Sequence, residues 1–525
     1  MKKSLLSILY TFIIGFVVYF FTLPALNLTS IAFWLFLLFL LIVFTFNYTM
    51  LNIGFTKKNY SSFKLVKYVG GFIALVFIVI FLNALIISPL FLSKKYSKRI
   101  TINENGKFSE EVSEVDFSKL PLLDKDSSQK LGDRVMGEMP ELVSQFFVSD
   151  LYTQINYDEK IYRVTPLEYN GFFKYLANHK DGVKGYITVN SSTGKAKLVK
   201  LNKGMKYLSS SILFEDLERV LRFKYPTKIF GEKSFELDNE GNPYWIVPTI
   251  KYTGIERLEE ISGVIILDPI TGKSNYYNVK DVPSWVDHVY SASLVISQLD
   301  DWGLYNNGFI NSIFDQKNVV STSDGYNYLS LGDDIYLYTG ITSVASDEAN
   351  IGFVLTNLRT KDTTMYKVSG AQEYSAMDSA EGQVQQMKYN ATFPLLINLG
   401  GKATYLMSLK DNAGLVKMYA FVDVKDYQKV VVTDAAKGIE YAANQYLQNN
   451  GLESNKTITK DITINSIKEA IIDGNTYYYF IDIEGTKYMT SIATNKSKLP
   501  FIKEGDTITV SYVGNDHIIT IKKIK

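Results

Sequence analysis

The sequence has no cysteine among its 525 residues and only three histidines. Disulfide frameworks, thiolate nucleophiles and thiolate metal sites are therefore excluded. His179, His288 and His517 lie far apart, and none has a second His at helical or hairpin spacing, so a transition-metal site is poorly supported. Gly-rich phosphate loops and the G-x-S-x-G nucleophile motif are also absent. Motifs therefore predict no catalytic, cofactor-binding or metal-binding residue.

Acidic residues are missing from the start of the chain, where the first is Glu104. The first hundred residues contain ten Lys or Arg, whereas the remaining 425 contain 45 basic and 54 acidic residues, a net charge of 45 − 54 = −9. The total charge of +1 hides this asymmetry. It indicates an N-terminal membrane segment followed by a soluble part.

Three uncharged apolar runs lie in the basic segment: Leu5–Leu26, Ile31–Leu51 and Tyr68–Leu92. Each is long enough to cross a bilayer, which takes about 20 apolar residues. None contains an ionisable residue, the usual mark of an ion path, so we interpret them as an anchor; a pore built from several copies is the alternative. Cleavage of the first run as a signal peptide is a further alternative, although its apolar stretch is unusually long and no A-x-A-like site follows.

Basic residues in short loops predict the orientation. Lys2, Lys3 and the loop Lys57–Lys67 favour the cytoplasm, which leaves everything after Leu92 outside. Four basic residues after the third run favour the opposite orientation: Lys94, Lys95, Lys98 and Arg99. Because large domains are translocated largely regardless of flanking charge, we predict a multi-pass cell-membrane protein with a large extracellular C-terminal domain.

The soluble part contains one strand–turn–strand pattern three times. A Gly opens an apolar strand, an Asn or Asp ends it, and a Thr follows eight residues after the Gly; the copies start at Gly185, Gly263 and Gly352. The residues that end the strands, Asn190, Asp268 and Asn357, can accept hydrogen bonds within the turn, and Gly194 and Gly272 allow a positive φ. A second strand follows in each copy, at 196–201, 274–279 and 363–368.

The middle copy has additional predicted elements around it. A helix from Ser210 to about Arg222 precedes a strand at Ser234–Leu237, a return strand at Pro243–Tyr252 and the Gly263 hairpin with its D-x-x-T-G-K turn. This order resembles the small PepSY domain of exported bacterial proteins over Ser209–Val279. The first copy, roughly Leu142–Leu201, fits less closely.

Two further phrases, Asp281-Val-Pro-Ser-Trp-Val-Asp287 and Gly370-Ala-Gln-Glu-Tyr-Ser-Ala-Met377, carry a second resemblance. With them, the stretch Leu120–Val432 resembles a widespread uncharacterised family of Gram-positive membrane-anchored proteins. That resemblance implies no known activity.

The C-terminal part begins with a helix after Asp434 and a polar linker at 449–456, followed by five strand-like runs with short turns. This pattern suggests a small closed β-barrel of OB or SH3-like type. Tyr477, Tyr478 and Tyr479 do not form a three-ring platform, because consecutive strand residues alternate faces. We therefore expect no nucleic-acid partner.

The predicted fold class is α+β, with three transmembrane helices, tandem PepSY-like units and a small C-terminal β-barrel. Asp281–Phe314 is expected to be largely helical. The predicted division is 1–92 for the three-helix membrane anchor, 93–205 for the first α+β unit, 206–280 for the PepSY-like unit, 281–432 for a third α+β unit and 433–525 for a helix plus the barrel.

Several carboxylates are candidates for chemistry. Asp287 could orient the imidazole of His288, although a surface or half-buried helical His is the simpler interpretation. Asp300, Asp301 and Trp302 could line a sugar cleft, but carboxylates adjacent in sequence do not supply two groups across one cleft. The other acidic pairs are Glu259-Glu260 and Asp333-Asp334.

Three functions follow from these observations. The first is a membrane-anchored cell-envelope protein whose extracytoplasmic domain binds or senses a partner without catalysis. The second is a subunit or docking platform of a membrane transport or secretion assembly. The third is an envelope hydrolase that uses Asp287, Asp300, Asp301, Asp333 and Asp334. The expected partners are the lipid bilayer and an envelope protein, with no cofactor.

Overall fold

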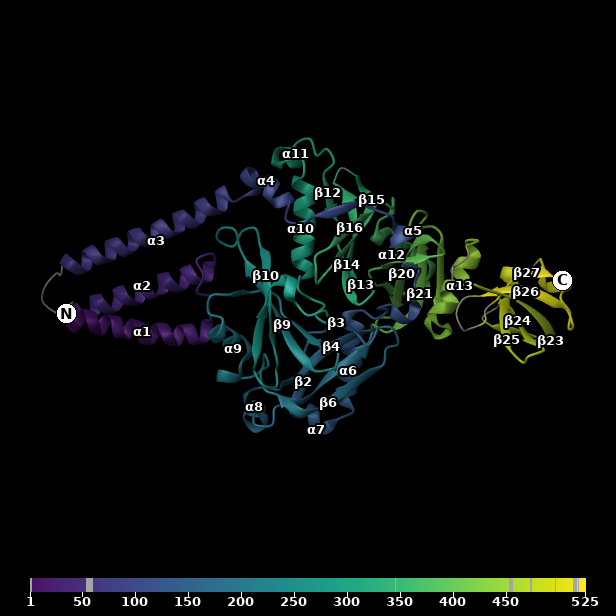
Figure 1. The fold of residues 1–525 in the computed structure, drawn as a ribbon, viewed down its shortest axis with the longest axis horizontal. Coiled ribbons are helices and arrows are strands. Elements are labelled where there is room, and N and C mark those ends of the chain that lie inside the picture. Colours follow the sequence, from purple (N-terminus) through teal and green to yellow (C-terminus); the bar gives the residue numbers. More distant parts are fainter. Residues whose placement is uncertain are drawn as a thin grey trace.

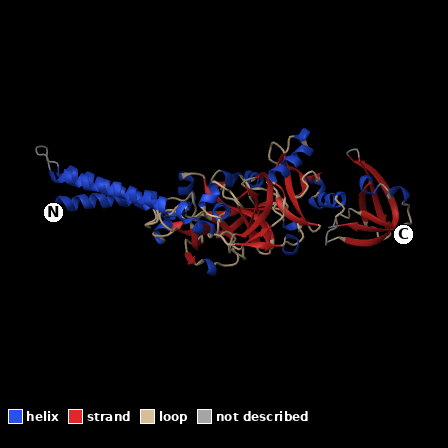
Figure 2. Ribbon diagram, turned by 90° about the horizontal axis from the view of Figure 1, so that it is seen from above, coloured by secondary structure: helices blue, strands red, loops and turns tan. Residues whose placement is uncertain are grey.

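The computed structural model describes residues 2–52, 60–344, 346–452, 457–472, 475–495, 497–512, 517 and 519–525. Three long N-terminal helices, a series of sheets and a separate C-terminal unit follow one another along the long axis of a mixed α+β fold, as Figure 1 and Figure 2 show. Lys57 and Lys58 of the predicted loop and residues 453–456 of the predicted linker lie outside the described residues.

The N-terminal helices are α1 (Lys2–Thr22), α2 (Ile31–Asn52) and α3 (Tyr60–Ile86). Within the described part of the chain these three are long and apolar enough to cross a membrane. Few of their side chains are buried inside the protein. This confirms the three predicted apolar helices, since a bilayer is the environment in which such surfaces are stable.

The third apolar run does not continue as one helix to Leu92. Ser88 is extended (φ −105°, ψ 161°), and a separate helix, α4 (Pro89–Ser97), begins at Pro89. Proline lacks the N–H that would continue the helix and restricts the residue before it to extended conformations. The third spanning segment is therefore shorter than predicted and ends at Ile86.

Four sheets of the soluble part share one topology. In each, the first strand pairs with the third, the second also pairs with the third, and the third, fourth and fifth pair in order. A helix precedes each set of five strands. We call the four sets repeats 1 to 4. The predicted unit 281–432 thus holds two sheets of this kind.

Repeat 1 contains α6 (Lys125–Gly137), α7 (Pro140–Val143), β2 (Phe146–Val148), β3 (Thr153–Tyr157), β4 (Lys160–Tyr169), α8 (Phe172–Asn178), β5 (Val183–Asn190) and β6 (Ala196–Met205). Repeat 2 contains η2 (Leu213–Glu215), α9 (Leu217–Lys224), β7 (Ile229–Phe230), β8 (Ser234–Leu237), β9 (Pro243–Lys251), β10 (Glu260–Leu267) and β11 (Ser274–Tyr277), followed by η3 (Val279–Asp281).

Repeat 3 contains α10 (Ala292–Tyr305), α11 (Phe309–Ile313), β12 (Val320–Thr322), β13 (Asn327–Leu331), β14 (Asp334–Ser343), β15 (Ser346–Asn357), β16 (Thr363–Tyr366) and β17 (Gly370–Ala371). Repeat 4 contains α12 (Glu373–Gln383), η4 (Gln385–Met387), β18 (Asn390–Ala391), β19 (Leu395–Leu399), β20 (Lys402–Lys410), β21 (Val416–Asp423) and β22 (Val430–Asp434). The expectation of a largely helical Asp281–Phe314 is wrong for its first third, because α10 starts only after the Ser291 cap.

The turn between the fourth and fifth strands confirms the predicted repeat chemistry. Across the turn, a backbone N–H donates to the backbone carbonyl oxygen of the residue five positions later, at 2.9 Å in each case. The three donors are Asn190, Asp268 and Asn357. The side-chain oxygen of each also accepts a backbone N–H two residues on. The structure adds a fourth example, Asp423, which accepts from the amides of Lys425 and Asp426.

Neighbouring repeats are joined by shared hydrophobic cores, as in other stacked-repeat proteins. One core joins repeats 1 and 2, and a second joins repeats 3 and 4. The core between repeats 2 and 3 includes side chains of α10, the first helix of repeat 3. Representative buried residues across the three junctions are Tyr186 with Trp245, Val264 with Leu337, and Phe353 with Tyr405.

The segment between the third span and repeat 1 first packs against repeats 3 and 4. It contains β1 (Ile102–Gly106), which pairs in parallel with β16, then α5 (Phe108–Glu111) and η1 (Phe117–Lys119). Phe108, Val112 and Leu122 belong to the core of repeats 3 and 4. This segment, which the sequence places in the first α+β unit, therefore ties the last two repeats to the membrane end of the chain.

The C-terminal unit has its own core and five strands in the order β25-β24-β23-β26-β27. Its elements are β23 (Ile458–Ile472), β24 (Asn475–Asp482), β25 (Lys487–Ser491), α14 (Ile492–Asn495), η6 (Leu499–Phe501), β26 (Thr507–Tyr512) and β27 (Thr520–Ile524). In the described residues the strand ladder does not close, although Met489 exchanges backbone hydrogen bonds with His517 and Ile519. The predicted closed barrel is therefore not found.

Two helical elements precede this unit, η5 (Ala435–Lys437) and α13 (Ile439–Asn449). Tyr446 of α13 packs in the core of repeats 3 and 4 rather than in that of the C-terminal unit. Tyr477 and Tyr479 lie on the face of β24 next to Tyr441, whereas Tyr478 packs on the C-terminal core. The predicted alternation of the three tyrosines is confirmed.

The ends of the spans are joined directly to repeat 2. Arg219 and Arg222 of α9 donate from Nε to the carbonyl oxygens of Phe20 and Leu23, each at 3.0 Å. These carbonyls lie at the end of α1, where helix geometry leaves them without intrahelical partners. On α3, the Asn83 amide exchanges hydrogen bonds with the backbone of Ile255. Repeat 2 is thus hydrogen-bonded to the ends of two spans, α1 and α3.

Candidate functional site

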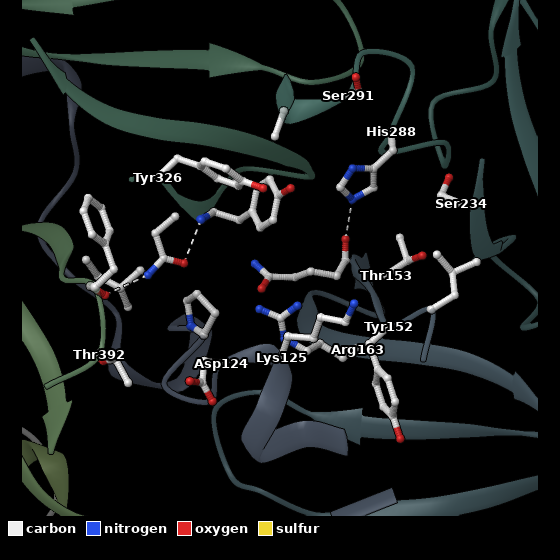
Figure 3. A pocket seen from close by; sticks show the side chains of 18 of the residues that line it. Asp124, Lys125, Tyr152, Thr153, Arg163, Ser234, His288, Ser291, Tyr326 and Thr392 are labelled. Atoms are coloured by element: carbon white, nitrogen blue, oxygen red, sulfur yellow. Dashed lines mark hydrogen bonds between the residues drawn. The ribbon is translucent and has the colours of Figure 1, made fainter. Parts of the chain in front are cut away.

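A cavity of about 630 Å³ lies where the four repeats meet. Each repeat contributes to its wall, with Arg163 from repeat 1, Ser234 from repeat 2, Tyr328 from repeat 3 and Phe393 from repeat 4. Figure 3 shows Arg163, Lys125 and His288 around this space. A site of this kind exists only when all four repeats are assembled, and its size suits a small ligand.

Arg163 is the most unusual residue of the wall. It lies on β4 and is 7% exposed. Its Nε donates a long hydrogen bond of 3.5 Å to the Leu123 carbonyl, and its Nη atoms make no hydrogen bond or ion pair with any residue that the structure describes. Burial lowers the pKa of Arg163, because the charged form loses solvation that the nearby carboxylates of Asp124 and Asp126 offset only in part. The guanidinium is therefore a buried cation that forms no salt bridge with any described residue.

Gln154 on β3 is also unsatisfied. It is 1% exposed, and neither its Nε2 nor its Oε1 has a hydrogen-bond partner in the described part of the chain. Native proteins pair most buried side-chain amides, so an orphaned carboxamide on a cavity wall requires an explanation. Its carboxamide, on a residue that lines the cavity, has a donor group and an acceptor that no described residue uses.

His288 is fixed by the same strand. Its Nε2 lies 2.7 Å from the backbone oxygen of Gln154, which can only accept, so Nε2 carries a proton. Its ring meets Tyr328 edge-on, with ring centroids 5.8 Å apart. Tyr328 in turn packs against Tyr326, which is 44% exposed, with centroids 5.6 Å apart. These rings form an aromatic wall beside the two polar residues.

The other charged residues around the cavity differ in their pairing. Asp124 forms an ion pair with Lys410; burial opposes ionisation, but the hydrogen bonds from Lys410 and Ser127 hold the pKa of Asp124 below its usual value. Lys233 forms an ion pair with Glu218. Lys125 has no ion pair within the described residues, and Glu232 is an exposed carboxylate on the wall.

The three histidines lie in different parts of the molecule. His179 stacks on Tyr175 at 5.2 Å, and His517 packs against Tyr488 and Tyr512 in the C-terminal unit. Among the described residues, no three His, Asp or Glu side chains come together as a metal site. Of the three, only His288 lines the cavity.

The hypothesis that Asp287 orients His288 is wrong. Asp287 is 2% exposed, and its Oδ2 accepts from the amide of Asn156 at 2.8 Å. The amides of Asp287 and His288 both donate to the buried carboxylate of Glu236. Burial, with the nearby Glu236 charge, raises the pKa of Asp287 well above its ordinary value. Asp287 therefore bonds to Asn156 and His288 to Gln154, and no hydrogen bond between the two side chains is described. His288 also lies outside any helix.

The remaining candidate carboxylates are occupied in separate structural contacts. Asp300 accepts from the amide and hydroxyl of Thr322, and Asp301 forms an ion pair with Arg99. Asp334 is bound by Arg359. Glu260 binds Lys361, and Asp333 lies in the exposed β13–β14 turn. These residues line no shared cleft, so the geometry required of a glycosidase pair is not formed by them.

Sequence reasoning missed Arg163 and Gln154. The available signal was the rarity of arginine, which occurs seven times against 48 lysines. Arg163 also interrupts the apolar strand run Ile161–Val164. On an open surface lysine serves equally well as a cation. An arginine inside a strand therefore indicates a position where two parallel hydrogen bonds from one guanidinium are needed.

No protein-family model matches the chain, and no curated protein matches it either.

Proposed function

We propose that the chain is a membrane-anchored, non-catalytic binding protein of the cell envelope, and that the central cavity is its ligand site. The ligand is a small anion with a carboxylate or phosphate group. The observation that carries this proposal is the buried Arg163 guanidinium, whose Nη atoms have no described partner, on the same wall as the unsatisfied Gln154 amide.

An unpaired buried charge is costly, because the loss of hydration amounts to several kcal/mol. A stable fold keeps such a charge when a ligand supplies the opposite charge. Guanidinium recognises carboxylates and phosphates through two parallel hydrogen bonds, which add geometric specificity to the attraction. Lys125, on the same cavity and without an ion pair in the described chain, adds a second positive charge.

The neutral groups select the rest of the ligand. The Gln154 amide can both donate and accept, whereas Tyr326 and Tyr328 offer ring faces to an apolar or sugar portion. These residues come from repeats 1 and 3. Binding therefore also couples two repeats that are separated in sequence.

The proposal includes the extracytoplasmic location of the soluble part and its resemblance to PepSY-like modules and to the Gram-positive membrane-anchored family. The loop charges support the location, and the recurring helix-then-hairpin order with its Asx turn supports the resemblance. A reporter fused after Lys525 tests the location. Activity of a reporter that works only inside the cell would contradict it.

The binding test uses thermal unfolding of the full chain in detergent, titrated with inorganic phosphate or citrate at constant ionic strength. Ligand binding to the folded state raises Tm. We expect a rise with at least one of these anions in the native protein and its loss in Arg163→Gln, since an amide cannot replace a bidentate cation.

The matched control is Arg134→Gln, which removes the same charge from an exposed site on α6 of the same repeat. This variant should keep the full anion-dependent rise in Tm. Equal rises in Arg163→Gln and the native protein, or no rise with either anion, would overturn the proposed site.

A further inference from the structure

Large apolar side chains are exposed at the end of the soluble part that carries the spans. One group, here called the α8 patch, consists of residues 49% to 79% exposed: Phe172, Phe173, Leu176, Leu213 and Phe214. The hydroxyl of Tyr175 on α8 bonds to the Ile212 carbonyl and to Glu215, which holds α8 beside η2. Clusters of large exposed apolar side chains mark contact surfaces.

The α8 patch is continuous with the first span. The ring of Phe214 lies 5.7 Å from that of Phe20 on α1, and the Arg219 guanidinium lies 4.2 Å above the Phe20 ring. Because Arg219 also binds the Phe20 carbonyl, the end of α1 and the start of the patch form one surface.

The backbone of this patch is held in an unfavourable conformation. Leu213 has φ +55°, a left-handed conformation that bulky residues rarely adopt. Such strain persists only where the surrounding structure enforces it, and it concentrates at functional positions. Here it coincides with the exposed side chains of Leu213 and Phe214, 54% and 73% exposed.

A second group of exposed apolar residues lies on the opposite side of the spans from the α8 patch, on α4 and at α11. It is here called the α11 patch and consists of residues 46% to 79% exposed: Leu90, Phe91, Ile310, Ile313 and Phe314. The helix α4 follows α3 after a break of two residues and packs against α10 and α11. Figure 1 shows α8 and α11 at opposite edges of the face from which the three spans extend.

Basic residues accompany both patches. Lys94, Lys95 and Lys98 are exposed beside the α11 patch, and Lys180 is exposed after α8. Lysines next to large apolar side chains are the pattern of surfaces that lie in the interface of a membrane with anionic lipids.

We propose that the α8 and α11 patches rest in the headgroup region of the bilayer, with the lysines among phosphates of anionic lipids. The soluble part then lies on the membrane at two points beside the spans. This contact explains why the apolar side chains stay exposed in the protein alone, and it is independent of the ligand in the cavity.

The test uses the absence of cysteine, which allows single-site labelling. Phe173→Cys and Phe314→Cys are labelled with an environment-sensitive fluorophore, and the full chain is reconstituted in nanodiscs of phosphatidylglycerol and phosphatidylcholine with a headgroup-quencher lipid. The control is Phe501→Cys, at a 70% exposed residue of the C-terminal unit. We expect quenching at both patch sites at least about threefold above that of the control.

Each variant must unfold at the temperature of the native protein, which shows that labelling leaves the fold intact. Replacement of phosphatidylglycerol by phosphatidylcholine should reduce quenching at Phe314→Cys, next to the lysines. Quenching equal to that of the control at both patch sites would overturn the proposal. Shielding from a water-soluble quencher without lipid quenching would also overturn it, because a second copy or another protein would then cover the patches.

Discussion

Repeats 1 and 3 have the same strand order and the same Asx turn, yet they use their arginines in opposite ways. Arg359 of repeat 3 makes three hydrogen bonds of 2.6 to 2.9 Å to Asp334 within its own repeat. Arg163 of repeat 1 makes a single long bond to a carbonyl and otherwise faces the cavity.

This difference separates two roles that a buried charge can have. Arg359 completes the fold, because its partner carboxylate comes from the same sheet. Arg163 leaves part of its hydrogen-bonding capacity unused by the described residues, and our proposal assigns that capacity to a ligand. The same contrast holds for Asp334, which is fully bonded, and Gln154, which is not.

The largest expected effect compares the two arginines directly. Arg359→Gln leaves the half-buried Asp334 without its cation and should lower the free energy of unfolding by about 2 kcal/mol. Arg163→Gln removes an unpaired charge and should change it by less than about 0.5 kcal/mol or increase it. Chemical denaturation followed by tryptophan fluorescence measures both. Similar losses in the two variants would contradict the distinction.

A second prediction concerns Asp287, which joins repeat 1 to the junction of repeats 2 and 3 through the Asn156 amide. Burial and then Glu236 raise its pKa well above 3.8. A carboxyl with a raised pKa in the folded state favours folding below its unfolded pKa, and this contribution is lost as pH rises through the folded pKa. The unfolding free energy should therefore fall between about pH 4 and the folded pKa of Asp287, with a slope of at most about 1.4 kcal/mol per pH unit, and stay constant above that pKa.

Asp287→Asn keeps an acceptor for the Asn156 amide and removes the titration. The variant should be more stable than the native protein at pH 7, and the difference should shrink towards pH 4. Denaturation at several pH values measures it. A difference that does not change with pH would show that Asp287 is not a buried neutral carboxyl.

The smallest effects concern the shared turn, in which the left-handed residue is Gly194 in repeat 1 (φ +72°) and Lys361 in repeat 3 (φ +68°). A Cβ on Gly194 would lie 3.6 Å from Leu123, so Gly194→Lys has room and should cost about 1 kcal/mol for the backbone conformation alone. Lys361→Gly relieves that strain but loses the bond of Lys361 to Glu260. The free energy of unfolding should therefore change by less than about 0.5 kcal/mol.

Gly272→Ala in repeat 2 is the contrasting control. Its Cβ would lie 2.5 Å from the Tyr207 ring, so the loss in thermal stability should exceed that of Gly194→Lys. Equal losses at the two glycines would mean that the close contact with Tyr207 is relieved at no cost.

Local patterns predicted much of the fold. The uncharged runs predicted three long helices, and the Asx turns at Asn190, Asp268 and Asn357 were read from residue type and spacing alone. The fourth turn at Asp423 was missed, because no Thr follows three residues after the Asp and the turn is one residue longer. The break at Pro89 was also missed, since hydropathy does not distinguish Ile86 from Leu92.

The candidate site was not predictable in this way. Gln154, Arg163, His288 and Phe393 are separated by up to 239 positions and come together through three shared cores. Nothing near Asp301 in sequence shows that Arg99 neutralises it, and nothing near Arg163 shows that no described carboxylate forms a salt bridge with it.

The order of residues alone establishes where apolar surface must meet lipid and where each hairpin turns, because both depend on side chains a few positions apart. Which charges are paired and which are not is decided only when the strands and repeats assemble. Pairing depends on distances of a few ångströms between segments from 25 to about 200 positions apart, as in Arg359 with Asp334 and Arg99 with Asp301, and no local pattern contains those distances.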